Sequence, residues 1–131
     1  DLNDNNIPNG NSIYLLILNK LNNICSEKKW NERIFMLSKS FHSHINSNFT
    51  QMFSYIKVLD ICENNITVTI SSKNLKIVEQ IIDQTIKKFM DKATIIYKED
   101  SSEEYFIICK NHTCSPKLKK IEEVKNYFKN L

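Results

Sequence analysis

The most reactive side chains of this sequence stand close together near its end. Cys109 and Cys114 enclose Lys-Asn-His-Thr, so two thiols and the imidazole of His112 fall within six residues. A thiol pair can exchange with disulfides, and cysteine and histidine side chains together can bind zinc. A structural zinc site needs about four ligands, and only three are local. Four residues separate the cysteines, whereas two separate those of a thioredoxin loop.

Three interpretations of this cysteine pair stay open. Cys109 and Cys114 are redox-active or structural thiols, they belong to a zinc site, or they only pack in the core. The last is the simplest, with Cys109 buried in a strand and Cys114 packed just before a helix, because free cysteines often behave as small hydrophobic residues. Cys25 and Cys62 end helical stripes, where we also expect core packing. We expect no metal and no cofactor.

A second unusual stretch combines the only glycine with one of the two prolines. Pro8, Asn9, Gly10, Asn11 and Ser12 directly precede an expected helix. The first turn of a helix leaves backbone N–H groups without partners, and short polar side chains there can accept from them. The turn therefore predicts either a simple helix cap or a polar ligand-binding turn at the mouth of a helical barrel.

The other polar side chains form no complete catalytic set. His42 and His44 are two residues apart, so they do not share a helix face. Acidic pairs occur at Glu99-Asp100, Glu103-Glu104 and Glu122-Glu123. Solvated loops or helix faces are the expected places for them, so we expect no enzymatic activity of the chain by itself.

Composition excludes several classes of partner. The chain has 131 residues, a formal net charge of +3 and 41% apolar residues, which is typical of a globular protein. No uncharged apolar run approaches the length of a membrane span. Arg33 is the only arginine among 18 basic residues, and because base readout favours arginine, we expect no nucleic acid. No signal-peptide pattern opens the sequence, which favours reduced thiols and a cytoplasmic location.

Residues 1–63 predict three amphipathic helices. The first begins after Asn11 or Ser12 as its cap, and a second apolar face on Ile13 and Leu16 suggests that its start is buried on both sides. Short connections at 25–29 and 46–48 favour antiparallel packing. The expected inward stripes are Tyr14, Ile17, Leu18, Leu21 and Ile24, then Trp30, Ile34, Leu37, Phe41 and Ile45, then Phe49, Met52, Phe53, Ile56 and Leu59.

Residues 64–131 change to a β-α-β-β-α pattern. Strict alternation over 66–70 predicts a half-buried strand, and 93–97 and 105–109 are further β-rich runs. We expect parallel strands on either side of the intervening helix and a hairpin loop at 98–103. The helix is expected to be capped by Ser71 or Ser72, with an inward stripe of Leu75, Val78, Ile81, Ile82, Ile86 and Phe89. Ser115-Pro116 predicts the start of the last helix, because proline favours a first helical turn.

The two unusual stretches together carry a family resemblance. The turn from Pro8 to Ser12 resembles the Pro-Ser-Gly-Asn-Ser turn of the large thioredoxin-domain-containing proteins similar to spermatogenesis-associated protein 20. Residues 106–116, Phe-Ile-Ile-Cys-Lys-Asn-His-Thr-Cys-Ser-Pro, resemble the C-terminal run of that family, a short strand followed by Cys-x-Asn-x-Thr-Cys and a nearby proline. Asn9 stands where the family has serine. The resemblance covers essentially the whole chain, as the C-terminal part of a longer protein.

The resemblance implies a thioredoxin-like domain and a six-hairpin α/α toroid upstream. Such toroids occur in sugar epimerases and glycosidases, so carbohydrate or thiol chemistry is implied by analogy of fold. By transfer, Asn9, Gly10, Asn11 and Ser12 would lie at a helix mouth of the toroid. Cys109 and Cys114 would lie in the closing C-terminal element.

These observations predict an α+β fold. A three-helix segment, residues 1–63, would be the end of the toroid, and a small α/β unit, residues 64–131, would follow it. The expected function is that of a non-catalytic C-terminal portion whose partners are the upstream thioredoxin-like domain and toroid helices, and which self-associates in isolation. The alternatives are a stand-alone module that binds proteins through its apolar helical face, and a small thiol or zinc protein centred on Cys109 and Cys114.

Overall fold

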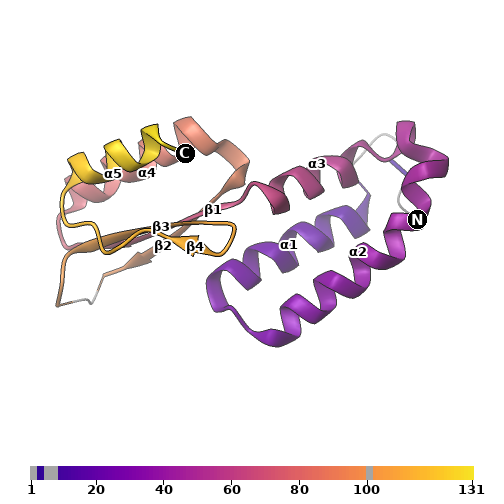
Figure 1. The fold of residues 1–131 in the computed structure, drawn as a ribbon, viewed down its shortest axis with the longest axis horizontal. Helices are drawn as coiled ribbons and strands as arrows, with labels where there is room; N and C mark the ends of the chain where they lie inside the picture. The colour runs from indigo at the N-terminus through magenta and orange to yellow at the C-terminus, as the bar shows by residue number, and fades with distance from the viewer. Residues whose placement is uncertain (1–2, 5–8, 100–101) are drawn as a thin grey trace. The chain divides into compact units, whose positions relative to one another are not determined.

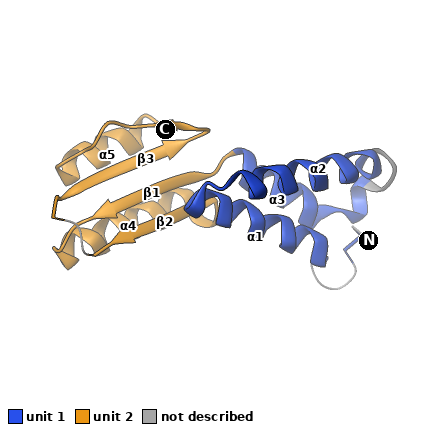
Figure 2. Ribbon diagram, turned by 90° about the horizontal axis from the view of Figure 1, so that it is seen from below, with its two compact units in different colours: residues 1–63 blue, residues 64–131 orange. Residues whose placement is uncertain are grey.

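The protein has an α+β fold in which helices precede a small sheet unit. The computed structural model describes residues 3–4, 9–99 and 102–131, and for residues 46–48 the backbone alone. The chain divides into two compact units, Asp1–Glu63 and Asn64–Leu131 (Figure 2). The boundary falls where the hydrophobic period of the sequence changes from helical to alternating. Within the described residues, no helix has both the length and the apolar character needed to cross a membrane.

The first unit, unit 1, consists of helices (Figure 1). They are α1 (Gly10–Cys25), α2 (Lys28–Asn48) and α3 (Phe53–Glu63), with a 3-10 turn at Phe49–Gln51. Helix α1 packs against both α2 and α3. The α2 helix continues through residues 46–48, where the sequence predicted a connection, and only the tighter 3-10 turn separates it from α3.

The core of unit 1 gathers residues from all three helices. The ring of Phe41 meets the buried ring of Tyr55 edge to face, with centroids 5.5 Å apart, an arrangement that aromatic pairs prefer. Four residues of the predicted inward stripe of α2, Ile34, Leu37, Phe41 and Ile45, pack against this core as predicted, whereas Trp30 is not part of the cluster. The buried cluster comprises Leu15, Met52, Tyr55 and Val58, with Leu16, Ile34, Leu37, Phe41, Ile45, Leu59 and Cys62 packed around it.

The predicted inward face of α1 is partly wrong, although Leu18 of that stripe is buried as predicted. The buried residues of this helix are Ser12, Leu15 and Leu18, whereas Ile17 and Ile24 are exposed. Its start is not buried on both sides either, because Ile13 is 45% exposed. Helix α1 is apolar on opposite faces, and periodicity alone does not say which of two apolar faces the other helices cover.

The predicted stripe of the third helix is also partly wrong, and here the backbone explains the error. Phe49 and Phe53 are exposed, whereas Met52 and Tyr55 are buried. The 3-10 turn advances about 120° per residue instead of the 100° of an α-helix. It therefore changes which side chains face inward when α3 begins.

The second unit, unit 2, is a four-stranded sheet with two helices. Its strands are β1 (Ile66–Ser71), β2 (Ala93–Lys98), β3 (Tyr105–Lys110) and β4 (Thr113–Cys114), and its helices are α4 (Leu75–Phe89) and α5 (Ile121–Lys129), with a 3-10 turn at Met90–Lys92. The strand order is β2-β1-β3-β4. As predicted, β1 and β2 are parallel. The predicted hairpin between β2 and β3 is wrong, because β3 pairs antiparallel with β1.

Both helices of unit 2 belong to one core on one face of the sheet. Alternation along the strands places Ile66, Val68 and Ile70 of β1 beside Phe106 and Ile108 of β3, and all five are buried. Helices α4 and α5 add Val78, Ile81, Val124 and Phe128 to the same cluster. Two residues of the predicted α4 stripe, Leu75 and Ile86, are exposed instead.

The helix starts of unit 2 differ from the predicted ones. Asn74, rather than Ser71 or Ser72, caps α4 by accepting from Ile77 N–H. The α5 helix begins at Ile121, not at Ser115-Pro116. The reason is that the segment after Pro116 is held extended, because Phe106 and Leu118 exchange two backbone hydrogen bonds of 2.8 and 2.9 Å.

Candidate functional site

The turn at Asn9 is a helix cap in unit 1. The Asn9 Oδ1 accepts from the Ser12 backbone N–H at 2.8 Å and from the Ser12 hydroxyl at 2.9 Å. Ser12 is fully buried. Gly10 is the first residue of α1, has no positive φ, and leaves open space where a Cβ would lie. The glycine is therefore not required by the backbone, and Pro8 lies outside the described residues.

Asp4 completes this cap, a role that the sequence patterns did not predict. Its Oδ1 accepts from the backbone N–H and the side-chain amide of Asn9, each at 3.0 Å, and its Oδ2 accepts from Ser54 N–H at 2.6 Å. Partial desolvation raises the pKa of Asp4, but the hydrogen bonds from Ser54 and Asn9 outweigh it and hold the pKa below the ordinary 3.8. Asp4 thus ties the N-termini of α1 and α3 together.

These contacts assign structural roles to two of the four predicted binding residues. Asn9 and Ser12 are engaged in the cap, while Gly10 is exposed and Asn11 is partly exposed. Ligand binding at this turn stays a prediction. The role of Asp4 could have been predicted from one feature of the sequence, a carboxylate shortly before a capping residue, because acidic side chains are stabilised near helix N-termini.

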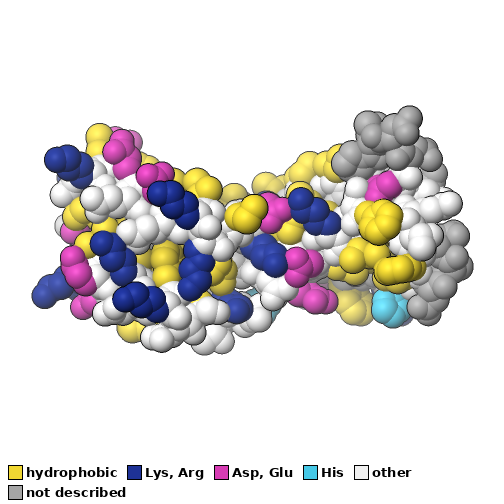
Figure 3. Space-filling view, turned by 90° about the horizontal axis from the view of Figure 1, so that it is seen from above, with side chains coloured by type: hydrophobic (Ala, Val, Ile, Leu, Met, Phe, Trp, Pro, Cys, Tyr) yellow, Lys and Arg dark blue, Asp and Glu magenta, His cyan; other side chains and the backbone are white. Residues whose placement is uncertain are grey.

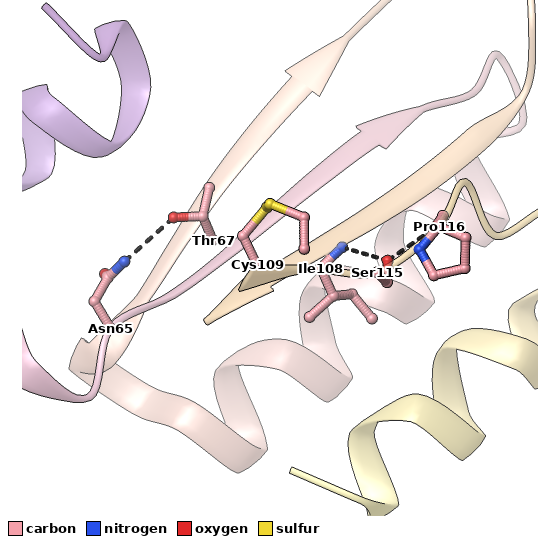
Figure 4. Close-up of a disulfide and its surroundings, with 7 residues drawn as sticks. Asn65, Thr67, Ile108, Cys109, Ser115 and Pro116 are labelled. Atoms are coloured by element: carbon pink, nitrogen blue, oxygen red, sulfur yellow. Dashed lines mark hydrogen bonds between the residues drawn. A yellow bond between two sulfur atoms is a disulfide. The ribbon is translucent and has the colours of Figure 1, made fainter. Parts of the chain in front are cut away.

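The cysteine pair lies in unit 2, on a tight hairpin. Asn111 and His112 have φ of 48° and 64°, as expected at the two central residues of the hairpin turn that matches strand twist. Cys109 of β3 is therefore directly opposite Cys114 of β4, and a disulfide joins them (Figure 4). Reduced thiols were predicted here, and that prediction is wrong.

The packing interpretation of this pair is also wrong. Cys109 is half-buried and Cys114 is exposed. Alternation along β3 places Cys109 on the face opposite Ile108, away from the core that α4 and α5 share with the sheet. Cys114 belongs to β4 and does not precede a helix, because α5 begins only at Ile121.

Polar contacts fix the strands around the disulfide. Cys109 is beside Thr67 in the sheet register, and the Thr67 hydroxyl accepts from Asn65 Nδ2 at 3.2 Å (Figure 4). Ser115 donates its N–H to the Ile108 carbonyl at 2.8 Å, and its hydroxyl accepts from Ile108 N–H at 3.1 Å. The return strand is thus anchored to β3 at Ser115, the residue that follows Cys114.

The zinc interpretation has no support in the described part of the chain. Within it, no three side chains of His, Cys, Asp or Glu lie close enough to hold a metal ion. The two sulfurs nearest to His112 are bonded to each other, and zinc takes thiolates.

Cys25 and Cys62 are free thiols in different surroundings. Cys25 is exposed, so the core position predicted for it is wrong. Cys62 packs against the core of unit 1. Burial raises the pKa of Cys62 to about 11, which the neighbouring Lys20 partly offsets.

We expect the four cysteines to react with iodoacetamide in three distinct phases. Cys25 should react first because it is exposed, and Cys62 much later, since at pH 8 a thiol with a pKa near 11 is almost entirely protonated. Cys109 and Cys114 should react only after a dithiol reductant is added. Mass spectrometry of peptides from timed samples measures each rate, with Cys25→Ser as control. Labelling of Cys109 and Cys114 without reductant would contradict the disulfide.

Of the predicted acidic pairs, Glu103 and Glu104 do not act together, and Asp100 lies outside the described residues. Glu103 binds Lys117 at 2.8 Å and Lys119 at 3.0 Å, and these bonds hold the pKa of Glu103 below its usual range. Glu104 instead accepts from the Ser72 hydroxyl at 2.5 Å. The two neighbouring carboxylates therefore serve separate structural contacts.

The two candidate sites thus reside in different units. Comparison of the chain with known protein families, with curated proteins and with solved structures found no match.

Proposed function

We propose that this chain is the C-terminal portion of a larger thioredoxin-domain-containing protein similar to spermatogenesis-associated protein 20. In this proposal unit 1 ends a six-hairpin α/α toroid and unit 2 follows as its closing element. The chain is not catalytic by itself. Its partners are the upstream helices of the toroid and the thioredoxin-like domain.

The observation that carries this proposal is an exposed apolar stripe on α1. Ile13, Ile17 and Ile24 are 45%, 50% and 53% exposed. At about 100° per residue they lie within about 40° of one another, on the side of α1 away from Leu15 and Leu18. Isolated apolar side chains on a surface are ordinary, but an aligned stripe indicates a face that another helix covers.

The hairpin supports the same proposal independently. The family resemblance rests on the run from Phe106 to Pro116, and in the structure this run is one continuous element. A strand with alternating buried residues leads into a two-residue turn, a disulfide and a return strand that Ser115 anchors. Its cysteines thus have a shared structural role, as a motif would require.

We expect the isolated chain to self-associate through the α1 stripe. The double variant Ile13→Lys/Ile17→Lys should be monomeric at concentrations where the wild type is not, because charged side chains oppose burial of the stripe. Sedimentation velocity measures this. Ile86→Lys is the matched control, because Ile86 is 52% exposed but belongs to unit 2. A monomeric wild type, or a control that also dissociates the assembly, would contradict the role of α1.

The gene upstream of Asp1 tests the rest of the proposal. Codons for helical hairpins, preceded by a thioredoxin-like strand with Cys-x-x-Cys, are expected. A start codon close to Asp1 would overturn the family assignment. It would favour the alternative of a stand-alone module whose α1 stripe binds another protein.

A thiol-disulfide function is the second candidate. The specific observation in its favour is that one residue of the Cys109–Cys114 disulfide, Cys114, is exposed. A thiolate of an external dithiol would attack one sulfur, and the second thiol of that dithiol would then release both cysteines as it becomes a disulfide. Catalysed reduction of a small disulfide substrate by the reduced chain supports this function, and loss of that activity in Cys114→Ser is expected.

A further inference from the structure

A groove between α4 and α5 is the strongest remaining feature of unit 2. It encloses about 490 Å³. Figure 3, which shows this side of the molecule, has lysine side chains (dark blue) grouped around hydrophobic atoms over the helices of unit 2. Its lining includes Lys87 and Lys88 of α4, and Glu122, Lys125, Phe128 and Lys129 of α5. The groove is formed by one unit alone.

The groove has a strong excess of positive charge. Four lysines and one glutamate line it. Lys88 donates to the Phe128 carbonyl, which ties the two helices together at one end. Among the described residues, no carboxylate forms an ion pair with Lys87, Lys125 or Lys129. These three ammonium groups are exposed and can meet a negatively charged partner.

The walls beneath these charges are mainly aliphatic. Lysine side chains cover apolar surface with their methylene stems while the ammonium groups reach solvent. Phe128 adds an aromatic residue that packs edge to face on Phe89, with centroids 5.3 Å apart. A suitable occupant therefore combines negative charge with an apolar group.

Helix ends distinguish between kinds of anion. Lys87 and Lys88 are in the last turn of α4, and Lys129 is in the last turn of α5. Helix C-termini carry partial negative charge, which opposes any anion close to these ends. The repulsion is strongest for a compact phosphate that concentrates its charge at one point, and weaker for carboxylates spread along the groove. No arginine is among the residues that line the groove, so it lacks the side chain that base readout favours.

We propose that the α4–α5 groove binds an acidic peptide segment that carries a large apolar side chain. An extended peptide advances about 3.3 Å per residue, so its carboxylates can spread along Lys87, Lys125 and Lys129. Its apolar side chain lies against the lysine stems and Phe128. This proposal concerns unit 2 alone and does not depend on the proposed function.

The test uses the full chain and a blocked peptide, acetyl-Glu-Glu-Leu-Glu-Glu-amide. Titration followed by NMR chemical shifts should give a Kd near or below about 1 mM, with the largest shifts at α4 and α5. Added salt should weaken binding, because exposed charges are screened. Replacing the glutamates by glutamine, or the leucine by alanine, should each weaken it severalfold.

Charge reversal in the groove provides the decisive comparison. Lys87→Glu/Lys125→Glu should weaken peptide binding by about tenfold or more, because like charges now face the peptide. Lys73→Glu/Lys76→Glu is the control, with the same change of charge at exposed positions outside the groove. The control should bind within about twofold of the wild type.

Three results would overturn the proposal. The first is an absence of shifts at the groove with about 5 mM peptide, five times the expected Kd. The second is an equal loss of binding in the control variant. The third is binding of inorganic phosphate or single-stranded DNA to the groove at least as tightly as the peptide, which would identify a general anion site.

Discussion

Replacing Phe106 by alanine is expected to lower the free energy of unfolding of unit 2 by about 3–5 kcal/mol. Phe106 is fully buried in the core cluster of unit 2. Its backbone also exchanges two hydrogen bonds with Leu118, so strand β3 and the segment that leads to α5 meet at this residue. The truncation leaves a cavity that these paired segments restrict from collapsing.

Hydrogen exchange followed by mass spectrometry can test the Phe106 prediction. Amides of β1 and β3 should lose most of their protection in Phe106→Ala. Ile107→Ala is the matched control, because Ile107 is on the opposite face of the same strand and is only half-buried. We expect a much smaller loss of protection in the control. Equal effects of the two substitutions would show that the core is not on the α4–α5 side of the sheet.

The stability of the cysteine hairpin should also depend on Phe106. The disulfide closes a loop of only six residues, so its direct contribution to stability is about 2 kcal/mol in the chain-entropy model, less than the expected contribution of Phe106. Loss of Phe106 should therefore expose Ser115 and the β4 strand even with the disulfide intact. The position of Cys114 in space is set mainly by the core beneath β3.

The sequence was informative wherever local pattern decides the structure. Alternation at 66–70 predicted β1, and the β-α-β order predicted its parallel pairing with β2. The boundary of the units coincides with the change of period near residue 64. These features follow from patterns within short segments, so a single sequence was enough to predict them.

Contacts between distant residues were not predictable in the same way. Asp4 and Ser54 are 50 residues apart in the sequence. The residues that flank each of them give no indication of the hydrogen bond between them. The Phe106–Leu118 pairing delays α5 beyond Pro116, although Ser-Pro is locally a good helix start. The disulfide depends on the two-residue turn at Asn111 and His112. This turn contains no glycine, which is the residue that usually indicates such a turn in a sequence.

Our second expectation is that Asp4→Ala lowers the free energy of unfolding of unit 1 by about 1–2 kcal/mol. The substitution removes the acceptor for three hydrogen bonds, two from Asn9 and one from Ser54. It thereby weakens the cap of α1 and the cap of α3 together. Lost caps of single helices cost about 1 kcal/mol each, so the upper part of the range is expected.

The Asp4 effect should depend on pH with a definite sign. Because the pKa of folded Asp4 is below its ordinary 3.8, its stabilisation is fully present above pH 3.8 and is lost as the pH falls through the lower folded value. The wild type and Asp4→Ala should therefore differ by a constant amount between pH 5 and 7. The difference should shrink as the pH is lowered below about 4.

Urea unfolding at several pH values, followed by the fluorescence of Trp30, measures this difference in unit 1, which contains the only tryptophan. Glu32→Ala is the control, because Glu32 forms only an exposed ion pair with Lys28 at 3.5 Å, worth less than about 1 kcal/mol. If the gap between wild type and Asp4→Ala persisted unchanged in acid, Asp4 would act through packing rather than charge. A difference that shrinks in acid would instead show that the Asp4 carboxylate, the Asn9 cap and the buried Ser12 act as a single structural unit.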